Sequence, residues 1–515
     1  MTLEQKRNIK GAFMLQSQNI KNISELQGIL NNNSAIINKV VDVFSEFKVC
    51  KILQDINKYK EKGFEAFHVL SALLLLPFIV EETIHGMIKS PITLITDMQK
   101  DVFYRLKNDE NIDWRKLLFS VAKRSLKIIN KKSIKPEESP GDIISQVKCL
   151  VFDDTVIQKT GDKIEGIGKV FDHVSNTFVL GFKMLGCCFW DGKSLNPLDF
   201  SLHSERGKNK KGKIFRSFGL TKKQLKERFR KKREKSTPGY ERKKELTKSK
   251  ITMMLEMFQN AIVNGFVPDY VLMDKWFISE KILKEIRESK KGNIHVIAAC
   301  KKDKRKYNYH GKAYTATELL KKKLEKKKRC RSLKTSYISI LVEYKDIPIM
   351  LFFNKPGRRK NWELLVTTDV KLSFIKALKI YRIRWGIEVF FKESKQHLLL
   401  GKCQSQDFDA HISDITLSMI RYILLNQYKR FSAYETLGEV FKDTRKFTLE
   451  LTIGQRLWLV FLEICCELLE IFDMDEEMFM NKLFSIPAFE EIVYFYFAKS
   501  NNQQNSGIKK SSKAA

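Results

Sequence analysis

The apolar residues change their period near residue 147, and this change restricts the fold more than any other feature of the chain. Up to about residue 140, apolar and charged residues recur at helical spacing, and the stretch ends in the turn-rich segment KKSIKPEESPGD. Short β-branched segments follow, namely VKCLVFDDTVIQ, FVLGFKMLGCCFWDG and NPLDFSL. We therefore expect a helical N-terminal domain followed by a domain built on a sheet.

The order of the segments after residue 250 indicates a mixed α/β core. DYVLMDKWF, SEKILKEIRESKKG and NIHVIAAC have the patterns of strand, helix and strand, which is a βαβ unit. The β-rich segments TSYISILVEY, IPIMLFF and NWELLVTTD then interrupt the core between about residues 303 and 370, and helical periodicity returns at residue 371. The sequence thus predicts an α/β fold with a β-rich insertion, flanked by helical N- and C-terminal regions.

The charge of the chain indicates an anionic partner. Lys and Arg outnumber Asp and Glu by 94 to 60, a formal net charge of +34. Such an excess attracts polyanions, and nucleic acid is the first of these to consider. The excess is densest in residues 206–250, here called the basic block, where 20 Lys and Arg stand against 4 Asp and Glu. A charge run is usually solvated surface, but this density favours contacts with phosphates.

A membrane is the competing partner, and the sequence argues against it. The segment VLSALLLLPFIV (residues 69–80) contains Pro77, and it is shorter than the ~20 residues that span a bilayer. We interpret it as a core helix. The opening MTLEQKRNIKG leads into no apolar signal segment, and the 9 cysteines form no CxxC pair. We expect a cytoplasmic protein with reduced thiols and no membrane partner.

Carboxylates are the candidate metal ligands, because the histidines and cysteines show no zinc-ligand spacing. Asp154 lies in the first strand segment (VFDDT), Asp274 ends a later one (VLMDK), and Glu388 lies in a helical segment beyond the insertion. Carboxylate oxygens suit Mg²⁺ or Mn²⁺, and two such ions can activate a water or a 3′-hydroxyl for phosphoryl transfer. Taken singly, an Asp at a strand end is more often a turn former or a helix cap.

The segment YRIRWGIEVFFKESK (residues 381–395) contains Glu388. If it forms one helix, Tyr381, Arg384, Glu388 and Lys395 fall within an arc of roughly 60°, with apolar residues on the far side. Taken alone, the periodicity favours a solvated stripe that also contains Lys392. The spacing therefore leaves open whether Glu388 is catalytic.

The spacing of these residues carries a family resemblance. The chain resembles the cut-and-paste DDE transposases of bacterial insertion sequences, in the branch with the signature Tyr-x2-Arg-x3-Glu-x6-Lys. Tyr381, Arg384, Glu388 and Lys395 match it at every spacing, downstream of DDT and LMDK in the expected order. The resemblance spans roughly residues 145–400.

The resemblance implies an RNase H-like core in which Asp154, Asp274 and Glu388 bind two Mg²⁺ or Mn²⁺ ions. The first acid is doubled in this chain, and only one of Asp153 and Asp154 can reach the metals, because successive strand residues face opposite sides. The Asp-Thr step of the family selects Asp154. If Asp153 is the essential residue instead, the strand register differs by one residue.

The resemblance also implies DNA-binding residues. Tyr381, Arg384 and Lys395 would contact phosphates near the cut, with Lys392 beside them. In the family a tryptophan before an LLxT-like strand stacks on a flipped base, and NWELLVTT puts Trp362 at that position. A core aromatic is the alternative for Trp362. Where the family often has an arginine after the second Asp, this chain has Lys301 and Lys302.

The expected protein is a DNA transposase that binds terminal inverted repeats as a homodimer, cleaves DNA and transfers 3′ ends to a target, in the cytoplasm and associated with the bacterial nucleoid. The alternatives are an RNase H-like nuclease without strand transfer and a catalytically decayed DNA-binding protein. The expected domains are a helical DNA-binding domain (1–140), the first part of the RNase H-like core (141–302), the insertion (303–370), the second part of the core (371–430), a helical C-terminal region (431–498) and a disordered tail (499–515).

Overall fold

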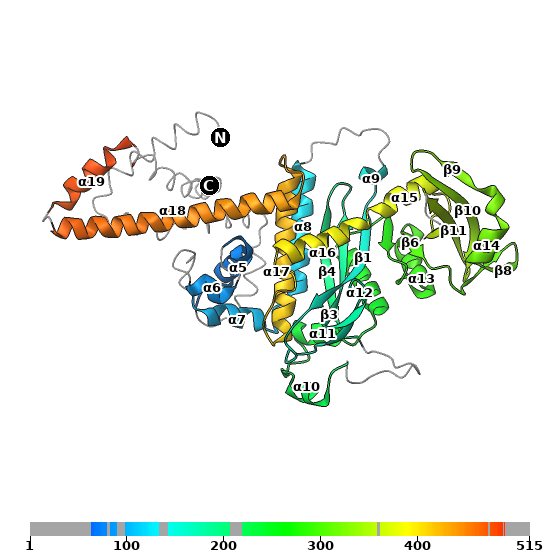
Figure 1. Cartoon of the computed structure of the whole chain (residues 1–515), viewed down its shortest axis with the longest axis horizontal. Coiled ribbons are helices and arrows are strands. Elements are labelled where there is room, and N and C mark those ends of the chain that lie inside the picture. Colours follow the sequence, from blue (N-terminus) through cyan, green and yellow to red (C-terminus); the bar gives the residue numbers. More distant parts are fainter. Residues whose placement is uncertain are drawn as a thin grey trace, which may run out of the picture. The chain divides into compact units, whose positions relative to one another are not determined.

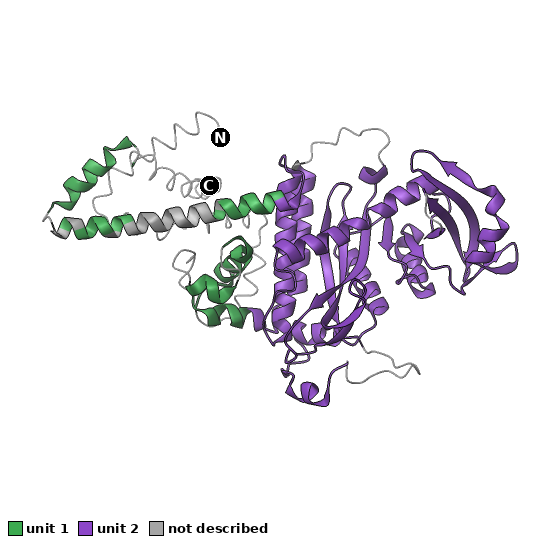
Figure 2. Ribbon diagram, in the orientation of Figure 1, with its two compact units in different colours: residues 1–106, 439–515 green, residues 107–438 purple. Residues whose placement is uncertain are grey.

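The computed structural model describes residues 63–79, 83–89, 98–132, 143–205, 219–357, 361–471, 474–487 and 489. The chain divides into two compact units, one of residues 1–106 with 439–515 and one of residues 107–438 (Figure 2). Three predictions fall outside the described residues. These are the helical domain before residue 63, residues 206–218 of the basic block and the disordered tail.

The first unit is helical in its described parts. The apolar segment that we interpret as a core helix forms α5 (Ala66–Leu75) and a 3-10 turn (Leu76–Phe78), and the side chains of Val69 to Phe78 are buried. No helix of the described residues is long and apolar enough to cross a membrane. The other helices that lie wholly or mostly in this unit are α6 (Ile84–Lys89), α7 (Lys100–Asn108), α18 (Leu437–Ile471) and α19 (Glu476–Phe484).

The second unit is built on a mixed sheet (Figure 1). Five strands follow the spatial order β4-β3-β1-β5-β6, in which β3 is antiparallel to both β4 and β1, and β5 is parallel to both β1 and β6. β2 pairs with β3 as well. The bounds are β1 (Cys149–Gln158), β2 (Gly168–Asp172), β3 (Thr177–Trp190), β4 (Leu195–His203), β5 (Tyr270–Met273) and β6 (His295–Cys300). This mixed α/β arrangement is compatible with the predicted RNase H-like class.

The β-rich insertion extends the same sheet. Its last strand pairs antiparallel with β6, so the order continues as β6-β12-β11-β10-β7-β8, and β9 pairs with β10. The lysine-rich segment that follows β8 forms only a short helix before it turns into β9. The bounds are β7 (Lys306–Tyr309), β8 (Lys312–Thr315), α14 (Ala316–Lys322), β9 (Lys328–Cys330), β10 (Thr335–Tyr344), β11 (Ile347–Pro356) and β12 (Glu363–Thr367).

Helices pack against the sheet and position the site. The helix α16 contacts β1, and its Phe391 lies so close to β3 that a Cβ atom at Gly186 would be 2.9 Å from the Phe391 ring. A larger residue at Gly186 would therefore displace the helix that carries Glu388. The remaining helices are α8 (Trp114–Lys132), α9 (Ile143–Gln146), α10 (Lys222–Glu227), α11 (Pro238–Glu245), α12 (Lys250–Val263), α13 (Glu280–Glu288), α15 (Phe374–Arg382), α16 (Trp385–His397) and α17 (Phe408–Arg430).

The prediction of one helix over residues 381–395 is wrong in one respect. The helix α15 ends at Arg382, a turn follows, and α16 begins at Trp385. Tyr381 therefore lies on a different helix from Glu388. Ile383 (φ −56°, ψ −30°) and Arg384 (φ −54°, ψ −34°) keep helical dihedral angles, so the turn is a short interruption between the two helices.

Candidate active site

Two aspartates lie at the same level on neighbouring parallel strands, Asp153 within β1 and Asp274 directly after the end of β5. β1 and β5 pair in parallel as far as Phe152 and Met273, and the next residues are Asp153 and Asp274. Residues opposite one another in a parallel pair direct their side chains to the same face, whereas successive residues alternate. Asp274 is therefore in register with Asp153 and not with Asp154.

The guanidinium of Arg384 joins two carboxylates. Its Nη1 donates to Asp153 Oδ2 at 2.7 Å, and its Nη2 donates to Glu388 Oε1 at 2.6 Å. The Arg384 side chain is only 15% exposed, and its Nε is buried without a hydrogen-bond partner in the described structure. The first strand of the sheet and the helix after the insertion are thus connected through one positive charge held between two negative ones.

The negative charge of Asp153 is only partly compensated by its contact with Arg384. Burial raises the pKa of its carboxyl to about 7, although the Arg384 guanidinium and the backbone N–H of Asp154 lower it. The negative charges of Asp154 and Asp274 also raise this pKa. A further cation at this point would stabilise the ionised form of Asp153.

Asp154 has different neighbours. Lys250 Nζ lies 2.7 Å from Asp154 Oδ2, and Lys183 Nζ lies 3.5 Å from Asp154 Oδ1. The Lys183 side chain is 3% exposed, so this pairing belongs to the packed sheet. The structure thus brings Asp153, and not Asp154, to Arg384 and Glu388. The assignment of Asp154 as a metal ligand stays a prediction.

The other signature residues are held within the protein. Lys395 Nζ donates to Thr155 Oγ1 at 2.7 Å and to the Val156 carbonyl at 2.9 Å, and burial lowers its pKa. Both hydrogen-bond partners of the Lys395 amino group therefore lie on β1. Tyr381 is half-buried with the Arg384 guanidinium 5.7 Å from its ring centroid, and burial raises the pKa of its phenol to about 12. Lys392 is exposed.

Three tryptophans differ in their exposure. Trp362, the predicted stacking residue, is half-buried just before β12, and its carbonyl accepts a hydrogen bond of 2.6 Å from Lys302. Trp276 and Trp385 were missed in the sequence, and their side chains are 51% and 62% exposed. Trp276 follows Asp274 by two positions and has Lys250 Nζ 4.3 Å from its ring, and Trp385 is adjacent to Arg384. Their closeness in sequence to the acids was the available signal.

Part of the basic block has a structural role, contrary to the expectation that it contacts phosphates. Arg233, whose side chain is 2% exposed, forms ion pairs with Glu165 at 2.7 Å, Asp409 at 3.0 Å and Asp407 at 3.2 Å. Lys231 binds Asp409 at 2.8 Å as well. These cations compensate buried carboxylates, and a phosphate contact by Arg233 is therefore excluded in this fold.

The donor set at Asp153, Asp274 and Glu388 fits a hard divalent cation, because it supplies carboxylate oxygens only. The undercompensated charge of Asp153 fits such an ion too. In the described part of the chain, no group of three His, Cys, Asp or Glu side chains is already arranged to hold a metal. Arg384 lies where two of the carboxylates would otherwise face a cation.

A mixed α/β fold with acids side by side on neighbouring parallel strands is compatible with metal-dependent nucleases and transposases. A comparison with protein-family models adds a second finding: residues 247–424 match the transposase DDE domain. This match supports a DDE transposase and includes Asp274 and Glu388, whereas β1 lies before it. A search of curated proteins finds no match.

Proposed function

We propose that the protein is a DNA transposase that binds the terminal inverted repeats of its element as a homodimer, cleaves DNA and transfers the 3′ ends to a target. The observation that carries this proposal is the bridge from Asp153 through Arg384 to Glu388, beside Asp274 and largely within the region that matches the transposase DDE domain. Phosphoryl transfer on DNA needs a cluster of acids of this kind.

The proposed ligands of two Mg²⁺ or Mn²⁺ ions are Asp274, Glu388 and one aspartate of β1. When bound, such ions would activate the attacking water or 3′-hydroxyl and stabilise the leaving oxygen. The family resemblance favours Asp154 as the third ligand, and the register of β1 with β5 favours Asp153. We propose Asp153, because its pairing with Arg384 brings it to Glu388, whereas Asp154 is paired with Lys250 and Lys183.

Arg384 has two roles in this proposal. Without a cation it offsets the repulsion between Asp153 and Glu388. With DNA bound, its guanidinium can contact a phosphate, since it is a forked donor that matches phosphate oxygens. Trp276 and Trp385 offer exposed ring faces on which bases near the cut can stack.

The central test uses Glu388→Ala in the full chain, with DNA that carries the element's own ends. Loss of a metal ligand should lower cleavage on the order of a hundredfold or more, while binding of end DNA in a chelator stays near that of the wild type. Glu393→Ala on the same helix is the matched control and should cleave normally. Wild-type cleavage by Glu388→Ala would contradict the proposal.

The choice between the two aspartates has its own test. Asp153→Asn should abolish cleavage, and Asp154→Asn should be milder, because it only weakens the pairing with Lys250. Calorimetry with Mn²⁺ on the free protein should show one metal site fewer in Asp153→Asn. If Asp154→Asn is the inactive variant and binds less Mn²⁺, the assignment of Asp154 from the family resemblance holds.

Two alternatives remain as outcomes of the same assay. Cleavage of end DNA without joining to a target would identify an RNase H-like nuclease that lacks strand transfer. Binding of end DNA without cleavage by the wild-type chain, in Mg²⁺ and in Mn²⁺, would identify a DNA-binding protein whose catalytic site has decayed.

A further inference from the structure

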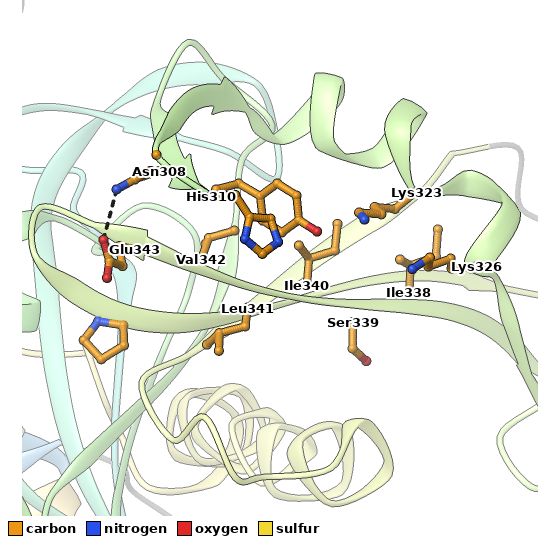
Figure 3. Close-up of a pocket in the computed structure, with 13 residues that line it drawn as sticks. Asn308, His310, Lys323, Lys326, Ile338, Ser339, Ile340, Leu341, Val342 and Glu343 are labelled. Atoms are coloured by element: carbon orange, nitrogen blue, oxygen red, sulfur yellow. Dashed lines mark hydrogen bonds between the residues drawn. The ribbon is translucent and has the colours of Figure 1, made fainter.

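The β-rich insertion contains a cavity of about 540 Å³ beside the strand β10 (Figure 3). On one side, β10 pairs with β11 along its whole length. On the other side, β9 pairs with residues 335–337 and β7 pairs only with Glu343. Residues 338–342 therefore have no strand partner on that side within the described structure, and the cavity lies between this stretch, the β7–β8 turn and the 3-10 helix Leu324–Lys326.

The two ends of the cavity differ in charge. Lys323 and Lys326 lie together at one end, while Asn308 and Glu343 lie at the other (Figure 3). Glu343 is the one carboxylate among the lining residues, and Asn308 donates a hydrogen bond of 3.0 Å to it. Neither Lys323 nor Lys326 has a carboxylate within 4.0 Å in the described structure, so both amino groups are free to bind an anion.

The surroundings of the cavity are strongly basic. Residues 301–334, here called the insertion's basic segment, contain 15 Lys and Arg against 3 Asp and Glu, a net charge of +12. Most of these side chains are exposed. Aromatic rings stand among them: Lys323 Nζ lies 5.0 Å from the Tyr309 ring centroid, and Lys322 Nζ lies 4.7 Å from that of Tyr314.

These features together fit a nucleotide. The floor of Ile338, Ile340 and Val342 is apolar, and the Tyr309 ring beside it can stack on a base. The uncovered edge of β10 can exchange hydrogen bonds with the base, since alternate residues of a strand direct N–H and C=O groups to each side. The lysines at the rim can neutralise the adjoining phosphates.

We propose that this cavity binds DNA by taking up one unpaired nucleotide, with its base against Tyr309 and the apolar floor and its phosphates on Lys323 and Lys326. The proposal rests on the proposed function only for the identity of the nucleic acid as DNA. An acidic peptide that adds a strand to β10 is the rival occupant. Because β9 and β7 cover both ends of the free edge, such a peptide could pair over only residues 338–342.

The roles of Lys323 and Lys326 are tested in the full chain by its binding to a single strand of 20 thymidylate nucleotides. A chelator is present, so that no metal-dependent cleavage occurs. Lys323→Ala with Lys326→Ala should weaken binding and reduce the slope of log K against log salt by about 0.7 for each phosphate that the variant no longer neutralises. Lys321→Ala with Lys327→Ala removes equal charge from the same segment outside the cavity and should change both quantities less. Equal effects in the two variants would mean that the cavity lysines act only through the overall charge of the segment, and this would overturn the proposal.

The base contact is tested with Tyr309. Tyr309→Leu should weaken binding roughly tenfold with an unchanged salt slope, because it removes a stacking surface and no charge. Tyr309→Phe keeps the ring and should restore binding. If Tyr309→Leu binds the strand as strongly as the wild type, the proposal that a base stacks on Tyr309 is wrong. The proposal is also wrong if a polyglutamate peptide displaces the strand at a lower concentration than unlabelled oligothymidylate does.

Failure here is distinguishable from failure of the proposed function. If the lysine pair proves irrelevant to binding while Glu388→Ala still abolishes cleavage, the transposase proposal stands and the cavity has no role in holding DNA. If the cavity binds the strand as expected and the wild-type chain cleaves nothing, the insertion is a DNA-binding module on a protein that does not catalyse transposition.

Discussion

The basic block and the insertion's basic segment look alike in sequence and differ in structure. In the described part of the block, Arg233 and Lys231 face buried carboxylates, and Arg242 lies 3.0 Å from Glu245. In the insertion, Lys323 and Lys326 face a cavity and have no acidic partner among the described residues. The density of positive charge alone therefore does not identify a DNA-binding surface. What matters is whether acids from distant parts of the chain already occupy the cations.

Arg233 is the position at which the two regions should differ most. Arg233→Ala leaves Glu165, Asp407 and Asp409 buried without their main cation, and we expect a loss of about 3–5 kcal/mol in the free energy of unfolding. Urea denaturation of the full chain measures it. Lys232→Ala, an exposed neighbour, is the control and should stay within about 0.5 kcal/mol. An Arg233→Ala variant as stable as the wild type would contradict the structural role of Arg233 in the basic block.

A second difference concerns pH. His203 lies buried next to the block: its Nδ1 is 3.2 Å from the Lys248 carbonyl and its Nε2 is 2.7 Å from Ser201 Oγ. Since a carbonyl only accepts, Nδ1 donates, and the neutral Nε2 accepts from Ser201. Burial lowers the pKa of His203 to about 4.

The direction of the pH effect follows from proton linkage. In the unfolded chain His203 has a pKa of about 6.5 and binds a proton below that pH. In the folded protein it stays neutral down to about pH 4. The free energy of unfolding therefore decreases as the pH falls from about 6.5 to about 4. The loss from this residue should be about 2 kcal/mol at pH 5. His203→Asn should remove that part of the pH dependence. His310→Asn, exposed in the insertion, is the control, and an unchanged profile in His203→Asn would contradict the prediction.

The stability of the insertion should depend least on its charges. Lys321→Ala with Lys327→Ala removes two exposed charges that form no ion pair in the described structure. The free energy of unfolding should change by less than about 0.5 kcal/mol. A larger loss, measured by the same urea titration, would mean that this segment resembles the block more than the structure indicates.

Much of the fold was predictable because it depends on local pattern. The β-branched period of β1, the βαβ order from β5 to β6 and the return of helix after residue 371 all follow from spacing along the chain. The position of Asp274 directly after a buried strand was visible in the same way. The break between α15 and α16 was not, because its apolar pattern is equally compatible with a continuous helix.

The site was predictable only in part. Glu388 and Arg384 were singled out from their spacing, and their contact at 2.6 Å joins residues one helical turn apart. The contact of Arg384 with Asp153 joins residues that are 231 positions apart. Sequence alternation says that one of two adjacent aspartates faces a given side, but the pairing of β1 with β5 decides which one.

Local patterns along the chain were enough to establish the α/β class, the place of the insertion, the carboxylates available for chemistry and the excess of positive charge. The packed fold was needed to show that Asp153 meets Arg384, that Lys395 is held by β1, and that Arg233 is buried. The physical reason is that helical and strand periods depend on neighbours within a few residues. The partners of a charged side chain depend on which distant segments the fold brings within hydrogen-bonding distance.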